Sequence, residues 1–213
     1  MKTTLKFIKP LLIILIPGLL LITDIRKSKA PFSENDYKLL LEDLQNGDII
    51  FRRGRSIESY AVLLADKRKE YSHVGIIWIE NRKPFVIHAV PDENTTEVEY
   101  IKKETIEIFL SKEKASKFAI YRSGLSEETN EKAAKIALQY YNNHYVFDGQ
   151  YDLNTDSKLY CTELIIKAFG QVDSQLQNFN STSLNFLFST KEIILPSNII
   201  EHPFFLKSLI IKN

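Results

Sequence analysis

Residues 73–90 have the sequence HVGIIWIENRKPFVIHAV, and the rest of the expected architecture is built around this stretch. Two runs rich in β-branched and aromatic residues, 73–79 and 85–90, flank the polar segment 80–83. Short β-rich runs separated by a polar turn predict an antiparallel hairpin. We therefore expect a β-hairpin at the centre of the fold.

The predicted hairpin brings two histidines together. With the turn at 80–83, Ile79 pairs with Pro84 and Gly75 pairs with His88. His73 and His88 then project from the same face at diagonally adjacent positions, roughly 7 to 8 Å apart at the backbone. Their rings are expected to touch, so that one imidazole can accept a proton while its neighbour fixes its tautomer. Each histidine taken alone is also compatible with a structural role in the core.

Cys161 is the single cysteine of the 213-residue chain. It lies near the start of a helix predicted over 159–169, behind Asp156 and Ser157, either of which can serve as the cap. A helix N-terminus lowers a thiol pKa and offers N–H donors to an oxyanion, so this position suits a nucleophile. Free cysteine is also a common space-filling core residue, which leaves both interpretations open on this evidence.

Composition disfavours several classes of function. The chain has 28 Lys plus Arg and 27 Asp plus Glu, a net charge of +1, so no overall field favours a nucleic-acid partner. One cysteine can form neither an intramolecular disulfide nor a multi-cysteine zinc cluster. The H-E-x-x-H metal motif and the glycine-rich nucleotide motifs do not occur, so we expect no metal and no cofactor.

Other polar residues are assigned structural roles. Glu163 and Lys167 stand four residues apart and are expected to form a surface ion pair. His144 and His202 fall in predicted loops without a paired spacing, so we interpret both as structural or surface residues.

Helices and strands alternate along the remainder of the chain. Strands are predicted at 48–52, 97–101, 118–121 and 193–195, and helices at 105–111, after Ser126, at 159–169 and after Pro196. A further helix, capped by Ser56, carries on one face the residues Ile57, Tyr60, Ala61 and Leu64. Helices interleaved with a mostly antiparallel sheet predict the α+β class.

The N-terminal segment has the composition of a targeting sequence. Lys2, Lys6 and Lys9 precede an uninterrupted apolar run at 11–22, which contains Pro17-Gly18 and is shorter than the ~20 residues that span a bilayer. We therefore expect residues 1–30 to be a signal peptide or an N-terminal membrane anchor, and in the second case residues 7–23 would be the membrane tether. Residues 31–213 are then one folded domain, which opens with a capping box at 33–36.

Three short motifs, in this order, resemble those of a known family. They are LQNGDIIFR at 44–52, YSHVGI at 71–76 and YCTEL at 160–164, accompanied by Phe147-Asp148 and by a late segment from Pro196 to Phe204. The combination resembles the permuted papain-like amidases of the YiiX/YaeF kind, in the NlpC-type cysteine peptidase superfamily, over roughly residues 40–206. The resemblance implies a circularly permuted papain-like fold, in which the histidine precedes the cysteine.

The resemblance also implies roles for three residues. Cys161 would be the nucleophile, His73 its general base and His88 the third polar residue. Many relatives carry Glu at the third position, whereas the lecithin:retinol acyltransferase group carries a second His, and a neutral imidazole stabilises an imidazolium less than a carboxylate does.

Together these observations predict a thiol-dependent hydrolase. It would cleave an amide bond of a peptide or lipid-like substrate through an acyl-cysteine intermediate, in the cell envelope or periplasm after export. Two alternatives remain: acyl transfer to an acceptor other than water, and a non-catalytic module that binds a peptide or lipid. The sequence leaves the oligomeric state open.

Overall fold

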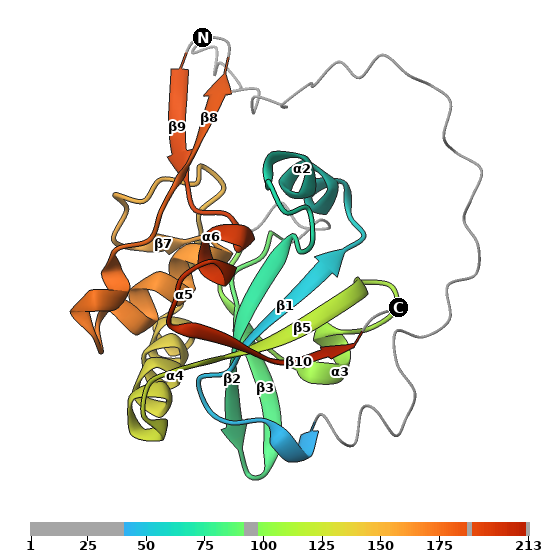
Figure 1. Ribbon diagram of the computed structural model, residues 1–213, viewed down its shortest axis with the longest axis vertical. Coiled ribbons are helices and arrows are strands. Elements are labelled where there is room, and N and C mark those ends of the chain that lie inside the picture. The colour runs from blue at the N-terminus through green and yellow to red at the C-terminus, as the bar shows by residue number, and fades with distance from the viewer. Residues whose placement is uncertain (1–40, 92–97, 187–188, 212–213) are drawn as a thin grey trace, which may run out of the picture.

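The computed structural model describes residues 41–91, 98–186 and 189–211 (Figure 1). Its main feature is a six-stranded sheet with the strand order β10-β5-β1-β2-β3-β4. The strands are β1 (Ile49–Gly54), β2 (His73–Glu80), β3 (Lys83–His88), β4 (Lys102–Thr105), β5 (Ala115–Ser123) and β10 (Phe205–Ile211). All neighbouring pairs in this sheet are antiparallel, so the predicted α+β class is confirmed.

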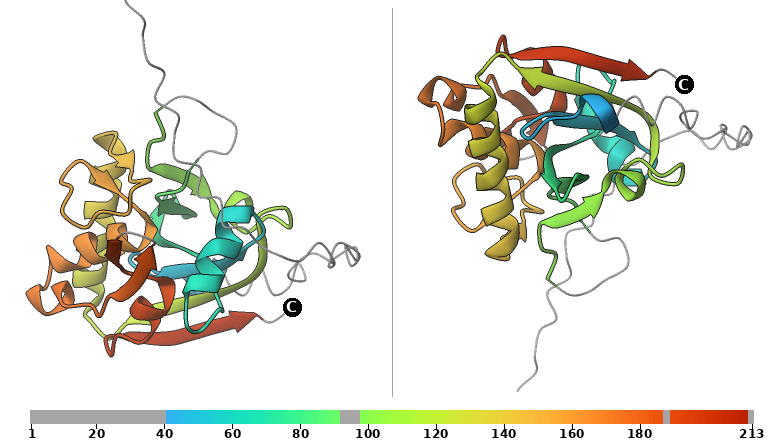
Figure 2. Two further views of the ribbon diagram at one scale, coloured as in Figure 1. Left: turned by 90° about the horizontal axis from the view of Figure 1, so that it is seen from above. Right: turned by 90° about the horizontal axis from the view of Figure 1, so that it is seen from below.

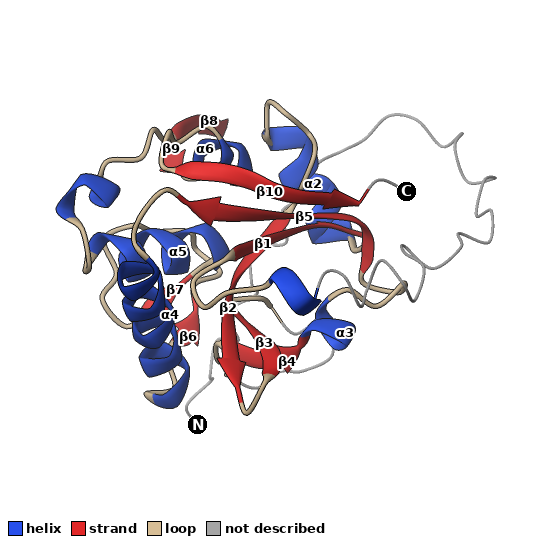
Figure 3. Cartoon of the chain, turned by 60° about the horizontal axis from the view of Figure 1, so that its bottom comes forward, coloured by secondary structure: helices blue, strands red, loops and turns tan. Residues whose placement is uncertain are grey.

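Helices cover both faces of the sheet. They are α2 (Ile57–Ala65), α3 (Ile106–Phe109), α4 (Glu127–Asn142), α5 (Cys161–Gly170) and α6 (Pro196–Ile200), with a 3-10 helix at Ser174–Gln177. Helices α4 and α5 lie on one side of the sheet and α3 on the other (Figure 3). Side chains alternate along β2, so this strand contributes to the hydrophobic core on both faces of the sheet. Ile76 packs in the cluster with α4 and α5, and Ile77 packs in the cluster with α3.

Two small sheets complete the described structure. Strands β6 (Val146–Phe147) and β7 (Lys158–Leu159) pair in parallel just before α5. Strands β8 (Thr182–Phe186) and β9 (Ser189–Ile193) form an antiparallel hairpin that projects from the body of the molecule (Figure 1). Neither pair was predicted, since the short β6 and β7 carry no periodic pattern and β8 is polar.

The predicted central hairpin has the expected register. Ile79 pairs with Pro84 and Ile76 with Ile87, so the turn falls at the polar segment. Gly75 lies opposite His88, and a Cβ atom at Gly75 would lie 3.1 Å from the Cβ atom of His88. The absence of a side chain at Gly75 therefore makes room for His88.

Several element boundaries differ from the sequence predictions. The strand predicted at 193–195 shares Ile193 alone with β9, which covers Ser189–Ile193. The strand predicted at 97–101 is wrong in position, because β4 begins at Lys102; of its described residues, Tyr100 forms a bridge with Val146. The helix predicted from residue 159 begins at Cys161, and its N-cap is Tyr160 rather than Asp156 or Ser157. The short strand β7 occupies Lys158–Leu159 and separates those two residues from the helix.

Helix α2 turns its predicted apolar face outward. Ser56 caps it as expected, by accepting a hydrogen bond from the Ser59 amide. Leu63 provides the buried contact, whereas Ile57, Tyr60 and Leu64 are exposed. The periodicity identified a stripe correctly but did not say which side of the helix the core would cover.

The predicted targeting segment at 1–30 and the predicted capping box at 33–36 lie outside the described residues. Within the part of the chain that the structure describes, no helix has the length and apolar character needed to cross a bilayer.

Candidate active site

His73 and His88 are in direct contact. The Nε2 atom of His73 lies 2.8 Å from the Nδ1 atom of His88, and the two rings meet edge to face. Both side chains are buried, with 7% and 1% of their surface exposed. The hairpin prediction therefore brought the two imidazoles together correctly.

A carboxylate lies on the far side of the pair. The Nε2 atom of His88 is 3.1 Å from an Oε1 atom of Glu104. Glu104 belongs to β4, which pairs with β3 so that Val86 faces Glu104 and His88 faces Lys102. Glu104 was not predicted from the sequence, because the strand that carries it was predicted at 97–101. His88 is the third polar residue that was predicted, and the carboxylate of Glu104 lies beyond it, in contact with His88 rather than with His73.

Cationic and aromatic groups enclose this row of side chains. Lys114 lies 2.9 Å from Glu104, and Arg52 lies 3.9 Å from it. Arg52 also donates a hydrogen bond to the Phe109 carbonyl and stacks over the Phe109 ring. Both histidine rings pack against the same Phe109 ring, which fixes their orientation.

The charges and burial set the protonation states of this row. Burial lowers the pKa of His73 well below its ordinary value, and the nearby Arg52 charge lowers it further. Burial likewise lowers the pKa of His88 to about 4, although Glu104 opposes this shift. Burial raises the pKa of Glu104, but contacts with His88 and Lys114 outweigh it and hold the pKa at about 2. At neutral pH the site therefore holds two neutral imidazoles beside an ionised carboxylate.

Cys161 is the first residue of α5, and its thiol lies at the start of β2. Backbone amides of Val74, Thr162 and Cys161 itself are directed at the sulfur. Val74 directly follows His73, so the thiol and the histidine pair meet at the same end of this strand. Among the described residues, no hydrogen bond joins Cys161 to His73; such contacts are often long in the absence of substrate.

The thiol is protonated in the resting site. Burial raises the pKa of Cys161 to about 11, and the surrounding amides and Arg52 only partly offset this effect. The helix N-terminus was expected to lower the thiol pKa, but the cost of desolvating a thiolate is larger here.

A cavity of about 440 Å³ opens beside the histidine pair. His73 and His88 contribute to its wall, as do Ser56, Ser59 and Val62 of the α2 segment. Phe147 and Tyr151 form another part of the wall. Tyr151 also lies near the sulfur, since a Cys161 thiolate would raise its pKa. Tyr151 therefore lies both in the wall of the cavity and near the thiol.

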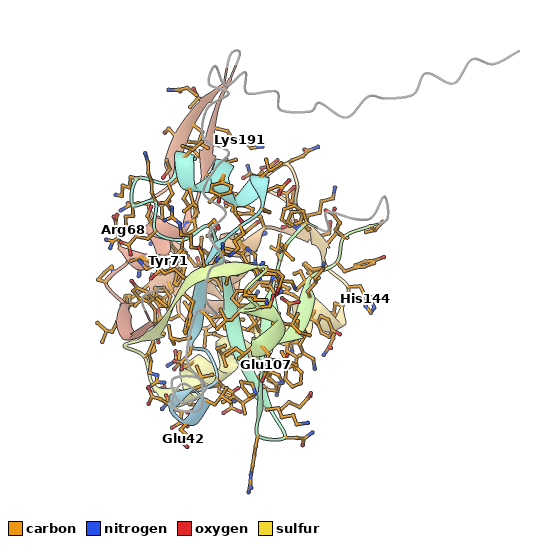
Figure 4. All side chains as sticks on the ribbon, turned by 90° about the vertical axis from the view of Figure 1, so that its right-hand side faces the viewer. Glu42, Arg68, Tyr71, Glu107, His144 and Lys191 are labelled. Carbon is orange, nitrogen blue, oxygen red and sulfur yellow. The ribbon has the colours of Figure 1, made fainter. Side chains whose placement is uncertain are left out.

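The remaining sequence candidates lie elsewhere. Glu163 and Lys167 form the predicted ion pair at 3.0 Å, but Glu163 is buried, so the expectation of a surface pair was wrong for its acidic member. His144 is exposed and projects from one side of the molecule (Figure 4). His202 packs against Phe179 and Phe204.

A cysteine at a helix N-terminus, beside a histidine pair on an antiparallel sheet, defines a papain-like arrangement. The histidine precedes the cysteine along the chain, which makes the arrangement a permuted one. The chain belongs to the family of permuted papain-like amidase enzymes of the YaeF/YiiX kind, whose model matches residues 43–205. This membership supports a cysteine-hydrolase type of activity at the level of the family.

Two further comparisons agree with this family. The chain is 32% identical over 127 residues to the uncharacterized protein YiiX of Escherichia coli K12, a match that covers 59% of this chain and 57% of that protein. The chain thus spans little more than half the length of that curated relative. The fold also resembles a crystal structure described as the metalloprotein YiiX from Escherichia coli O157:H7, with a TM-score of 0.64 and 23% identity, covering 79% of this chain and 98% of the other.

Proposed function

We propose that this protein is a thiol-dependent hydrolase that cleaves an amide bond through an acyl-cysteine intermediate. One arrangement carries the proposal: the His73–His88–Glu104 row ends beside a cysteine at a helix N-terminus. This is the relation of nucleophile, base and orienting group that covalent catalysis by a thiol requires.

The proton path follows from the ring contacts. The Nε2 atom of His73 faces His88, so Nδ1 is the nitrogen that accepts the thiol proton. Nε2 of His73 then donates to Nδ1 of His88, and the proton of His88 lies on Nε2, the nitrogen 3.1 Å from Glu104. The carboxylate selects this pair of tautomers, because it stabilises an N–H on the near side of His88.

The chemical step is general-base assisted. Because the resting thiol and imidazoles are neutral, the proton moves to His73 as the sulfur–carbon bond forms. The amides of Val74, Thr162 and Cys161 are near enough to stabilise negative charge on sulfur or on the oxyanion. His73 returns the proton to the leaving amine as the carbon–nitrogen bond breaks, and water then hydrolyses the thioester to a carboxylic acid and regenerates the thiol.

No step is routed through a metal ion. The crystal structure from Escherichia coli O157:H7 is described as a metalloprotein. In this chain, within 41–91, 98–186 and 189–211, no group of three or more His, Cys, Asp or Glu converges in a way that fits a metal ion. The Nε2 atom of His73 and the Nδ1 atom of His88 are directed at each other, so these two donors are already committed.

The setting proposed for this activity is the cell envelope after export, with a peptide or lipid-like amide as substrate. The basic and apolar sequence of residues 1–30 supports export. The partly apolar cavity supports a substrate with an acyl or side-chain group, through Val62 and Phe147.

The test uses an activated acyl ester, p-nitrophenyl acetate, and intact-mass spectrometry. We expect one acetyl group on Cys161 and turnover that Cys161→Ala abolishes and that His73→Ala lowers by at least about a hundredfold. His144→Ala, which changes an exposed histidine outside this row, is the matched control and should react like the wild type.

Two outcomes decide between hydrolysis and its rivals. An acyl adduct that passes to an added primary amine faster than to water would replace hydrolysis by acyl transfer. The absence of any Cys161-dependent adduct or turnover, with the protein folded, would overturn catalysis and leave a binding module.

A further inference from the structure

Tyr151 has an unusual backbone conformation beside the cavity. Its φ angle is +55°, in the left-handed region that bulky side chains rarely adopt because of steric strain. The residue also lines the cavity that contains His73 and His88. Backbone strain of this kind persists where the surrounding structure enforces it, and it is concentrated at functional sites.

The surrounding segment enforces this conformation. The buried carboxylate of Asp148 accepts hydrogen bonds from the amides of Gln150 and Asp152, the two residues that flank Tyr151. Lys191 of β9 donates a hydrogen bond to the Gln150 carbonyl. In both views of Figure 2, the light orange segment around residue 150 lies on the same side of the sheet as α5. Contacts on both sides of Tyr151 therefore hold it in one position.

The ring of Tyr151 lies next to the start of α5. Its centroid is 5.4 Å from the ring centroid of Tyr160, the N-cap residue that directly precedes Cys161. Burial raises the pKa of Tyr151 to about 12, and a thiolate on Cys161 would raise it further, so the phenol is within electrostatic reach of the sulfur. The side chain is thus close both to the nucleophile and to the cavity.

The hydroxyl of Tyr151 is available to a ligand. Within the part of the chain that the structure describes, this hydroxyl has no hydrogen-bond partner, and it is not fully buried. The hydroxyl of Tyr160 differs, because it accepts a hydrogen bond from the Ile194 amide. With a pKa of about 12, the Tyr151 phenol keeps its proton throughout the neutral range. Tyr151 therefore offers an unused hydrogen-bond donor in the cavity wall.

We propose that the Tyr151 hydroxyl donates a hydrogen bond to the oxyanion that forms when Cys161 attacks the substrate carbonyl. In this step the sulfur–carbon bond forms and the π electron pair of the carbonyl moves to its oxygen, while the phenol keeps its own proton. The amides of Val74, Thr162 and Cys161 are directed at the sulfur, so Tyr151 adds a donor on the cavity side. A donor fixed in advance needs no rearrangement during the reaction. This role rests on the proposed hydrolase function.

The experiment compares two reactions of the same thiol. Acylation of Cys161 by p-nitrophenyl acetate passes through an oxyanion, whereas alkylation by iodoacetamide displaces iodide from a saturated carbon and forms none. Tyr151→Phe keeps the ring and removes only the hydroxyl. We expect it to slow acylation at least about tenfold and to leave alkylation at the wild-type rate. The matched control is Tyr60→Phe, which changes an exposed tyrosine outside the cavity wall and should alter neither rate.

The pH dependence adds a second readout. Because the phenol does not titrate near neutrality, the ratio of wild-type to Tyr151→Phe acylation rates should be constant from pH 6 to 9. A ratio that changes across this range would assign proton transfer to the phenol and overturn the oxyanion role. An equal loss of acylation and alkylation would also overturn it, because Tyr151 would then act by positioning or exposing the thiol.

Failure of this inference is distinct from failure of the hydrolase. If Tyr151→Phe acylates as fast as the wild type, in a reaction that Cys161→Ala abolishes, the oxyanion donor is refuted and the hydrolase stands. If acylation of folded wild-type protein does not depend on Cys161, the hydrolase is refuted together with this role of Tyr151. Cys161 is the single cysteine, so Cys161→Ala also gives the baseline for alkylation.

Discussion

Glu104 lies 3.1 Å from the Nε2 atom of His88, on the side of that ring opposite to His73. This contact places an ionised carboxylate at the end of the histidine row, where it stabilises positive charge that develops on either imidazole. A buried imidazole alone would stabilise an imidazolium poorly, as the low pKa of both rings indicates. Glu104 therefore provides the negative charge that His88, a neutral imidazole, cannot provide.

Replacement of Glu104 by Gln should lower kcat/KM by about tenfold to a hundredfold, because the transition state loses a counter-charge. Glu104 raises the pKa of His88, so its neutralisation should also move the acidic limb of the pH–rate profile to lower pH. Glu104→Asp should recover part of the rate. The matched control is Glu113→Gln, an exposed carboxylate that lines the same cavity. An unshifted acidic limb with a reduced rate would indicate that Glu104 acts only through packing.

The thiol of Cys161 should alkylate slowly at neutral pH. Because its pKa is raised to about 11 by burial, the thiolate fraction keeps rising well above pH 9. Iodoacetamide labelling from pH 5 to 10 measures this rate. Labelling of the protein unfolded in urea gives the reference rate of an exposed thiol, whose pKa is about 8.5. A plateau below pH 8 in the folded protein, lost in His73→Ala, would instead demonstrate a preformed thiolate–imidazolium pair and contradict this expectation.

The buried histidines should make the protein sensitive to mild acid. Their pKa values are lower in the folded protein than the unfolded value of about 6.5, so the unfolded chain binds more protons in this range. The free energy of unfolding should therefore fall as pH is lowered from about 6.5 toward 4, by up to about 3 kcal/mol from His88 alone.

Urea unfolding at several pH values measures this dependence. His88→Asn should show a shallower slope between pH 6.5 and 4, whereas the exposed His144→Asn should keep the wild-type slope. Glu104 contributes in a different window, since its lowered pKa gives stability that is lost only as pH falls from about 4.5 toward 2. Identical slopes for wild type and His88→Asn would contradict the buried neutral state of this ring.

The sequence predicted the features that depend on neighbouring residues. The register of the β2–β3 hairpin follows from the alternation and turn within residues 73–90, and it brought His73 to His88. The start of α4 after Ser126 was predicted for the same reason, because the cap and the helical period are local signals.

Features that depend on distant contacts were missed. Glu104 meets His88 because β4 pairs with β3 after a long connection, and the β-rich sequence at 97–101 indicated a strand that ends before Glu104. The pKa of Cys161 depends on how much protein surrounds the sulfur, which the helix position alone does not tell. The outward face of α2 was likewise undetermined, since periodicity marks a stripe without identifying its environment.

Replacement of Gly75 by Ala tests how the hairpin holds the histidine pair. A Cβ atom at this position would lie 2.4 Å from a Val86 methyl carbon and 3.1 Å from the His88 Cβ atom, so β3 would have to move. We expect a loss of about 1 to 3 kcal/mol in the free energy of unfolding, the usual cost of overpacking a core. Activity should fall in the folded fraction as well, because His88 moves away from His73. The control is Gly124→Ala, where the nearest atom to a new Cβ is 3.9 Å away and stability should change by less than about 0.5 kcal/mol. Equal stability and activity of the two variants would show that β3 yields without disturbing the imidazole contact, and the tight Gly75–His88 approach would then have no part in positioning the base.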